Sequence, residues 1–253
     1  MSTSENWPFP RLIAHRGGGS LAPENTLSAI RAGNQRGFKA VEFDVVLAAD
    51  GVPVLLHDDT VDRTSNGRGP VNALDSRSLA GLDAGSWFGP AFKGEPVPRF
   101  EEAAGLCVSL GLWANIEIKP TSGAEKETGR KAASIARAAW KGISPQPLLS
   151  SFQPESLAAA REVAPELPRG LLFDAVPSDW LERLQTLGCM ALHCNAEKLD
   201  QELARTIKDA GYGLAVWTVN DANQAKRLFA LGVDAIFTDR LDIFGPGFDV
   251  SCS

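Results

Sequence analysis

Residues 100–119 read FEEAAGLCVSLGLWANIEIK and contain the signals of a helix, a turn and a strand in succession. Its first half, 100–110, spaces apolar residues as an amphipathic helix does. Gly111 follows as the residue type that most readily takes the left-handed conformation at the end of a helix. Residues 112–118 then form a short apolar run typical of a buried strand. Helix, glycine and strand together make the repeating unit of a parallel α/β fold.

The same unit recurs along the chain of 253 residues. Apolar runs of strand length lie at 12–14, 40–47, 112–118, 148–152, 170–173, 191–194, 213–219 and 235–238. Helical patterns separate them at 24–36, 100–110, 126–140, 154–163, 178–187, 200–210 and 221–231. Repetition on this scale favours a closed (β/α)8 TIM barrel over an open doubly wound sheet, whose G-x-G-x-x-G fingerprint is absent. A barrel predicts that functional residues lie at the C-terminal ends of strands.

One segment departs from this rhythm after the second strand. Asp50-Gly51 is a turn signal and 52–56 a further short strand, which predicts a hairpin that returns His57 toward the barrel mouth. Residues 58–99 are rich in Gly, Pro and polar side chains, with aromatic residues among them. We expect a small insertion or lid at 58–99. Because no linker divides the chain, 1–253 is expected to form a single catalytic domain.

Composition narrows the function. The formal net charge is -6, without a basic cluster, which argues against a nucleic-acid or anionic membrane surface. No apolar stretch approaches the roughly 20 residues that cross a bilayer, and 1–10 lack the pattern of a secretory signal. The four cysteines lack a zinc or redox spacing and suit a reducing compartment. We expect a cytoplasmic enzyme with a small-molecule substrate, no nucleic-acid partner and no stable membrane insertion; the oligomeric state is open.

Charged residues interrupt two of the predicted strands. Because side chains alternate along a strand, Glu42 and Asp44 point to one face, roughly 7 Å apart, and Glu117 and Lys119 share a face of the next strand. Burying such carboxylates costs several kcal/mol per ion. A hard divalent cation would compensate the acids, and oxygen ligands suit Mg²⁺, Ca²⁺ or Mn²⁺ better than Zn²⁺. The alternative is a structural network in which Lys119 and Arg16 neutralise the acids.

Histidine is scarce, and two of the three, His15 and His57, fall at predicted strand ends beside the acidic cluster. Imidazoles on either side of a metal-bound phosphate would supply a general base and a general acid near neutral pH. His193 also ends a predicted strand, where core packing and pocket lining are both open. Trp217 is either a core residue or the apolar wall of a substrate pocket. The glycines at 17–19 permit either close approach to a ligand or a plain turn.

The order of these motifs along nearly the whole chain resembles the glycerophosphodiester phosphodiesterase family, particularly its bacterial cytosolic branch. The matching motifs are HRG at 15–17, PENT at 23–26, EFDV at 42–45, HD at 57–58, DRT at 62–64, GEPVP at 94–98, EIK at 117–119, SF at 151–152, VWTVN at 216–220 and TD at 238–239. Arg99-Phe100 departs from the more usual Thr-Leu, outside the acidic cluster.

The resemblance implies a TIM barrel with a small insertion that hydrolyses glycerophosphodiesters to sn-glycerol 3-phosphate and an alcohol. One histidine would deprotonate the glycerol hydroxyl beside the phosphoester, which attacks phosphorus. The other would protonate the leaving alcohol, and water would then open the cyclic phosphate. The implied roles are Mg²⁺ or Ca²⁺ binding by Glu42, Asp44 and Glu117, acid–base catalysis by His15 and His57, and phosphate contact by Arg16 and Lys119. Alcohol preference would lie in lid and loop side chains such as Trp87, Phe88, Phe152 and Trp217.

Two other functions stay open from the sequence. A Schiff-base aldolase or isomerase would use Lys119 as its nucleophile, although the neighbouring carboxylates would hold that lysine protonated. Trapping of a substrate adduct with borohydride would reveal it. A phosphoester-binding protein without catalysis is the other alternative, and the presence of both histidines together with the three acids counts against it.

Overall fold

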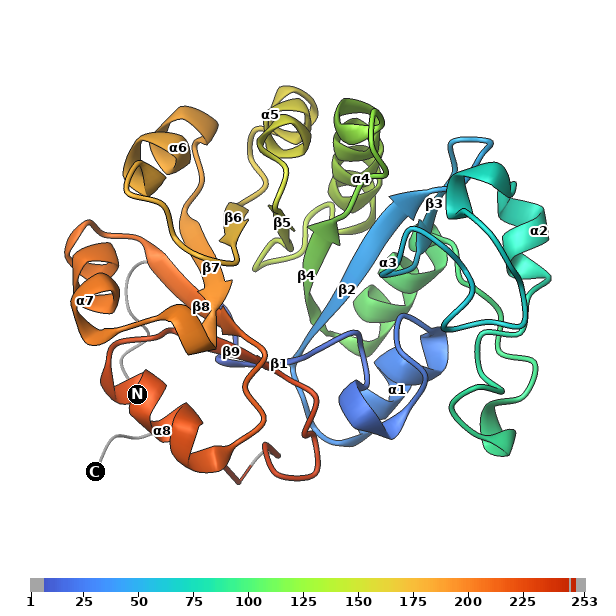
Figure 1. Cartoon of the computed structure of the whole chain (residues 1–253), viewed down its shortest axis with the longest axis horizontal. Helices are drawn as coiled ribbons and strands as arrows, with labels where there is room; N and C mark the ends of the chain where they lie inside the picture. The colour runs from blue at the N-terminus through green and yellow to red at the C-terminus, as the bar shows by residue number, and fades with distance from the viewer. Residues whose placement is uncertain (1–6, 246, 249–253) are drawn as a thin grey trace.

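A closed barrel forms the centre of the computed structural model, which describes residues 7–245 and 247–248. Its parallel strands pair in chain order, and β1 pairs with both β2 and β9, so the sheet closes on itself (Figure 1). The strands are β1 (Leu12–Ala14), β2 (Ala40–Leu47), β4 (Trp113–Ile118), β5 (Leu148–Ser151), β6 (Arg169–Phe173), β7 (Ala191–Asn195), β8 (Gly213–Trp217) and β9 (Ala235–Thr238). The predicted TIM barrel is confirmed.

Helices surround the barrel between successive strands, as Figure 1 shows. They are α1 (Leu27–Gln35), α3 (Phe100–Leu110), α4 (Glu125–Ala139), α5 (Pro154–Val163), α6 (Trp180–Leu187), α7 (Gln201–Asp209) and α8 (Ala222–Ala230). Asp200 and Asp221 cap the N-termini of α7 and α8, where each side chain accepts a backbone N–H. Gly111 and Gly188 close α3 and α6 in the left-handed conformation. Among the described residues, no helix is long and apolar enough to span a membrane.

Two apolar cores lie on opposite sides of the barrel wall. Outward-facing strand residues such as Phe43 and Ile116 pack against the helices in the larger core. Inward-facing residues such as Trp113 and Phe237 fill the barrel itself. Trp7 and Phe9 from the N-terminal segment belong to this inner core, and the Phe9 ring stacks on Trp113 at 4.6 Å. This inner core therefore fills part of the barrel interior. The polar inward-facing residues lie elsewhere along the same strands, where a site can form.

The predicted hairpin and insertion follow β2. β3 (Pro53–Leu55) pairs antiparallel with the end of β2, and the chain then leaves the barrel until α3. This excursion contains η2 (Val71–Ala73), α2 (Ser76–Ala80) and η3 (Pro90–Phe92). It buries an apolar cluster of its own, in which Val61, Val71 and Leu79 pack with hairpin residues such as Val46 and Val54. The segment that lacked periodicity is therefore a packed element of the fold.

Some element boundaries differ from the sequence prediction. We expected the first helix to begin at Glu24, but α1 begins at Leu27. Asn25 has a φ of 58°, which a helix does not accommodate, and the Thr26 side chain caps the helix by accepting from the N–H of Ala29. β8 ends at Trp217 rather than at 219. Turn residues thus replace regular structure at the start of α1 and at the end of β8. Two short 3₁₀ segments, η1 (Gly19–Leu21) and η4 (Ala196–Lys198), complete the connections.

The structure resolves the role of His193, which the sequence left open between core and pocket. The ring is fully buried on β7 between Trp7 and Phe237, at centroid distances of 6.0 and 5.5 Å. Neither ring nitrogen has a hydrogen-bond partner in the described part of the chain. Burial lowers the pKa of His193 to about 3, so the imidazole is neutral at physiological pH.

His193 should make the fold sensitive to acid. The unfolded chain binds a proton at this group below its ordinary pKa of 6.5, while the folded chain does so only near 3, so stability falls as the pH is lowered between these values. At about pH 5 the loss is about 2 kcal/mol relative to neutral pH. Urea unfolding of the wild type and His193→Leu at both pH values measures it. Equal losses in the two proteins would contradict this origin.

Candidate active site

One pocket collects the residues that the sequence analysis proposed for metal binding, proton transfer and phosphate contact, together with Phe152 and Trp217. It has a volume of about 150 Å³ and opens among the strands of the barrel. The residues that line it are His15, Arg16, Glu42, Asp44, His57, Asn115, Glu117, Lys119, Phe152, Leu172, Trp217, Thr218 and Phe237. Buried polar atoms of this lining have no partner in the described residues: Nε of Arg16, Oδ1 of Asn115 and Nε1 of Trp217. A polar ligand would complete their hydrogen bonds.

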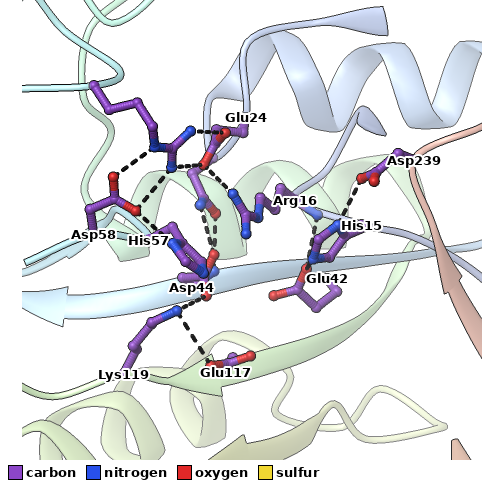
Figure 2. A network of polar contacts seen from close by, with 12 residues as sticks. His15, Arg16, Glu24, Glu42, Asp44, His57, Asp58, Glu117, Lys119 and Asp239 are labelled. Atoms are coloured by element: carbon purple, nitrogen blue, oxygen red, sulfur yellow. Dashed lines mark hydrogen bonds and ion pairs between the residues drawn. The ribbon is translucent and has the colours of Figure 1, made fainter. Parts of the chain in front are cut away.

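The carboxylates of Glu42, Asp44 and Glu117 meet on two neighbouring strands. Each offers an oxygen, and these oxygens lie within 4.8 Å of one another. The register of β2 against β4 pairs Asp44 directly with Glu117. Nζ of Lys119 lies 3.7 Å from Asp44 and 4.0 Å from Glu117. Figure 2 marks both ion pairs with dashed lines. Parallel pairing of two strands with alternating side chains thus brings the acids together as the sequence analysis expected.

Burial makes this acidic cluster costly without a cation. Burial raises the pKa of Glu117 to about 8, and the charge of Asp44 adds to the shift. Burial and the charges of Asp44 and Glu117 raise the pKa of Glu42 well above its ordinary value. The guanidinium of Arg16 pairs with Glu24 at 2.6 Å instead of with these acids. The donor set, which consists of carboxylate oxygens with incomplete charge compensation, therefore fits a hard divalent cation.

Two residues with strained backbones hold the carboxylates in place. Arg16 and Asn25 have φ values of 50° and 58°, which non-glycine residues rarely adopt. In this conformation the backbone N–H of Arg16 donates to Glu42 at 2.8 Å. The side chain of Asn25 donates to Asp44 at 2.8 Å and accepts from the Asp44 backbone N–H at 3.0 Å. The loop after β1 is thus shaped to orient two of the three acids.

The glycines of the same loop serve packing rather than ligand approach. Gly17 has a φ of 86°, and a side chain there would meet the backbone of Ile30 at 3.0 Å. A side chain on Gly19 would collide with the carbonyl oxygen of Asp239 at 2.3 Å. None of residues 17–19 lines the pocket. Of the two readings of these glycines, the structure therefore supports the turn.

His15 lies at the end of β1 and is held by a carboxylate. Its Nδ1 lies 2.7 Å from Oδ1 of Asp239, and its Nε2 lies 3.9 Å from Glu42. The Asn220 side chain donates to the other oxygen of Asp239 at 3.1 Å. Hydrogen bonds from His15 and Asn220 outweigh burial and lower the pKa of Asp239. An ionised Asp239 accepts a hydrogen bond from Nδ1–H of His15. The unprotonated Nε2 of His15 then faces the pocket.

His57 follows β3 and is held in a similar way. Its Nδ1 lies 2.7 Å from Oδ1 of Asp58. Arg63 donates to both oxygens of Asp58, at 2.7 and 3.0 Å, and these bonds lower the pKa of Asp58. Burial lowers the pKa of His57, with smaller contributions from the charges of Lys119 and Arg16, against the opposing effect of Asp44 and Asp58. The neutral imidazole therefore prevails at neutral pH.

The apolar side of the pocket is aromatic. The rings of Phe152 and Trp217 meet edge to face at 5.7 Å, and Leu172 and Phe237 line the same pocket. Phe152 keeps 38% of its surface exposed, which leaves it available to a ligand. Trp87 and Phe88, which we grouped with these residues, lie away from the lining; they pack with Phe92 in the excursion.

Sequence reasoning assigned no role to the residues that hold the site in place. Among them, Asp58 and Asp239 orient the histidines, Asn25 orients Asp44, and Arg63 binds Asp58. Their signal was present: Asp58 directly follows His57, and Asp239 directly follows the last strand. Strand-end position therefore points to such partners, but it does not say which group each one contacts.

The fold and the pocket together define a class, a TIM-barrel hydrolase. The chain belongs to the Glycerophosphoryl diester phosphodiesterase family, whose sequence profile matches residues 15–243. A glycerophosphodiester phosphodiesterase of Caldanaerobacter subterraneus is 35% identical, over 90% of this chain and 93% of the relative. The family resemblance of the motifs is thus confirmed, and the protein is a phosphoric diester hydrolase.

Solved structures agree with this assignment. A phosphodiesterase of Oleispira antarctica, in complex with the product sn-glycerol-3-phosphate, is 39% identical with a TM-score of 0.88, over 91% of this chain and 93% of its own. A glycerophosphodiester phosphodiesterase of Agrobacterium tumefaciens is 29% identical with a TM-score of 0.78, over 93% and 99%. The fold is therefore shared with enzymes of this kind.

Proposed function

We propose that the protein hydrolyses glycerophosphodiesters to sn-glycerol 3-phosphate and an alcohol by histidine acid–base catalysis, with the help of a divalent cation. The observation that carries this proposal is the pair of carboxylate-held histidines at the acidic cluster. His15 lies beside Glu42, and His57 lines the same pocket as Asp44. The product bound in the Oleispira antarctica relative supports the substrate class.

The histidines would divide the proton transfers between them. One imidazole takes the proton of the glycerol hydroxyl next to the phosphoester as that oxygen attacks phosphorus. The other gives a proton to the oxygen of the leaving alcohol, and water then opens the cyclic phosphate with the two roles exchanged. Asp239 and Asp58 accept hydrogen bonds from the Nδ1–H groups of His15 and His57, so each ring presents Nε2 to the reaction.

Cationic and apolar groups would position the substrate. The side chains of Arg16 and Lys119 line the pocket and supply positive charge for the phosphoryl oxygens. Nε of Arg16, buried and without a partner in the described residues, is a donor free for this purpose. Phe152 and Trp217 offer an apolar wall to the glycerol or alcohol carbons.

Glu42, Asp44 and Glu117 would hold the cation, which we propose to be Mg²⁺ or Ca²⁺ because all of its protein ligands are carboxylate oxygens. When bound, such a cation neutralises the acids and stabilises charge that develops on the phosphoryl group.

Release of sn-glycerol 3-phosphate is the direct test. Metal-stripped protein is incubated with glycerophosphocholine or glycerophosphoethanolamine, with and without Mg²⁺ or Ca²⁺, and the product is quantified by a coupled dehydrogenase assay. We expect release that depends on the cation. Absence of product with either cation and both substrates would reject this substrate class. The ratio of the two rates reports the preferred alcohol.

A further inference from the structure

The insertion contributes two side chains, Asp58 and Arg63, to the contacts around the site. Arg63 lies between β3 and α2, and its guanidinium donates to two carboxylates, those of Asp58 and Glu24. Its Nε and Nη2 donate to the two oxygens of Asp58 at 2.7 and 3.0 Å. Its Nη1 and Nη2 donate to the two oxygens of Glu24 at 2.7 and 2.8 Å. One guanidinium thus makes a fork with each of two acids.

Each of these acids also binds a pocket residue. Oδ1 of Asp58 lies 2.7 Å from Nδ1 of His57. Oε1 of Glu24 accepts from Nη1 of Arg16 at 2.6 Å. The result is a continuous chain of charge-assisted hydrogen bonds from His57 through Asp58, Arg63 and Glu24 to Arg16. It joins a histidine proposed for proton transfer to an arginine proposed for phosphate contact.

The geometry points to Arg63 as a positioning residue, and we propose that it sets the orientation of His57 and Arg16 together. This inference rests on the proposed function of these two residues. It gives the insertion a role beside the pocket, since no residue of 58–99 is among those that line the cavity.

Burial and charge indicate that the hydrogen bonds of Arg63 are stronger than those of an exposed surface ion pair. The side chains of Glu24 and Asp58 are only 13% and 28% exposed, although Arg63 is 45% exposed. Bidentate forks to partly buried carboxylates are stronger and more directional than single exposed ion pairs. Burial raises the pKa of Glu24, but the hydrogen bonds from Arg63 and the neighbouring positive charges lower it overall. Both acids are therefore ionised partners of Arg63.

The insertion also fixes the backbone that carries Arg63. Val61 belongs to the buried apolar cluster of the insertion, and Thr64 and Ser65 are buried. The Ser65 hydroxyl donates to the carbonyl of Val61 at 2.6 Å and accepts from the N–H of Gly67 at 3.0 Å. Arg63 therefore extends from an anchored turn toward the barrel mouth.

Loss of Arg63 should affect the residues at both ends of this series of hydrogen bonds, His57 and Arg16. Without it, Asp58 loses its second partner and no longer holds the His57 ring in one orientation. Arg16 then becomes the main cationic partner of Glu24, and the Glu24 carboxylate competes with the substrate phosphate for the Arg16 guanidinium. We expect Arg63→Met to lower kcat by about 10- to 100-fold and to raise KM, because small misplacements of catalytic groups have effects of this size. Arg63→Lys keeps the charge but not the fork, so its loss should be smaller.

A measurement on His57 itself separates positioning from general destabilisation. The chain has only three histidines, so long-range ¹H–¹⁵N spectra of the rings can be assigned with single His→Gln variants. In the wild type His57 should carry its proton on Nδ1, opposite Asp58. Arg63→Met should shift the His57 signals toward a mixture of tautomers and leave those of His15 unchanged, since His15 is held by Asp239.

Arg68→Met is the matched control. Arg68 belongs to the same segment and is 76% exposed, with Asp62 at 3.9 Å as its acidic partner. It should leave kcat, KM and all histidine signals unchanged. Unaltered His57 signals in Arg63→Met, or equal shifts in His57 and His15, would overturn the inference. A wild type that releases no glycerol 3-phosphate would reject the proposed function instead, while the His57 spectra would still decide the role of Arg63.

Discussion

Removal of divalent cations with EDTA should abolish turnover, and Mg²⁺ or Ca²⁺ should restore it. The reason is the acidic cluster of Glu42, Asp44 and Glu117, whose oxygens lie within 4.8 Å of one another and of which Lys119 contacts two. Without a cation these acids repel substrate phosphate and hold protons, since burial raises the pKa of Glu117 to about 8. Because a cation must displace those protons, less Mg²⁺ should suffice for half-maximal activity as the pH rises from about 6 to about 8.

Thermal unfolding supplies a readout that does not depend on turnover. Cation binding to the native state should raise the melting temperature of the stripped protein. Glu117→Gln should remove most of that rise, whereas Glu162→Gln, which changes an exposed carboxylate paired with Arg130, should retain it. Full turnover in EDTA would favour the alternative of a salt-bridge network formed by Lys119 and Arg16.

The barrel could be predicted from the sequence because local signals agreed with the global fold. The range 100–110 is both the predicted and the observed helix, and the predicted strands 12–14, 40–47 and 235–238 match β1, β2 and β9. Errors concentrate beside the site. There, side-chain hydrogen bonds decide the backbone, as at Asn25, whose left-handed conformation serves Asp44 and delays the start of α1.

In the candidate site too, the residues on regular strands could be predicted, whereas those in irregular segments could not. The sequence alone could predict that the three carboxylates lie close together, because strand alternation and parallel pairing place Glu42, Asp44 and Glu117 within one register. Arg63 could not, since it reaches Glu24 across 39 positions of sequence from a segment without periodicity. The lid role expected for 58–99 stays a prediction, as the aromatic residues of that segment pack among themselves.

His15→Ala and His57→Ala should each lower turnover by about 100-fold or more while the fold is retained. A positioned acid or base contributes a factor of this order, and each variant removes one of the two proposed proton-transfer groups. Both rings are partly exposed in the pocket, so their loss creates no sealed cavity in the core. Turnover of glycerophosphocholine under saturating cation, together with far-ultraviolet circular dichroism, gives the comparison. His193→Leu is the control, because His193 lies outside the pocket lining.

Free imidazole distinguishes lost proton transfer from lost structure. If a histidine acts as acid or base, added imidazole can occupy the space vacated in the alanine variant and restore part of the rate, whereas it cannot repair a distorted pocket. We expect rescue of both variants and none of Glu117→Gln, whose defect lies in the acidic cluster. Asp239→Asn and Asp58→Asn should fall between the wild type and the alanine variants, because each leaves the ring in place but replaces the carboxylate at 2.7 Å, which only accepts, with an amide that can also donate and no longer selects the tautomer. Near-wild-type turnover of either alanine variant would contradict the acid–base assignment for that histidine and leave its partner to account for both proton transfers.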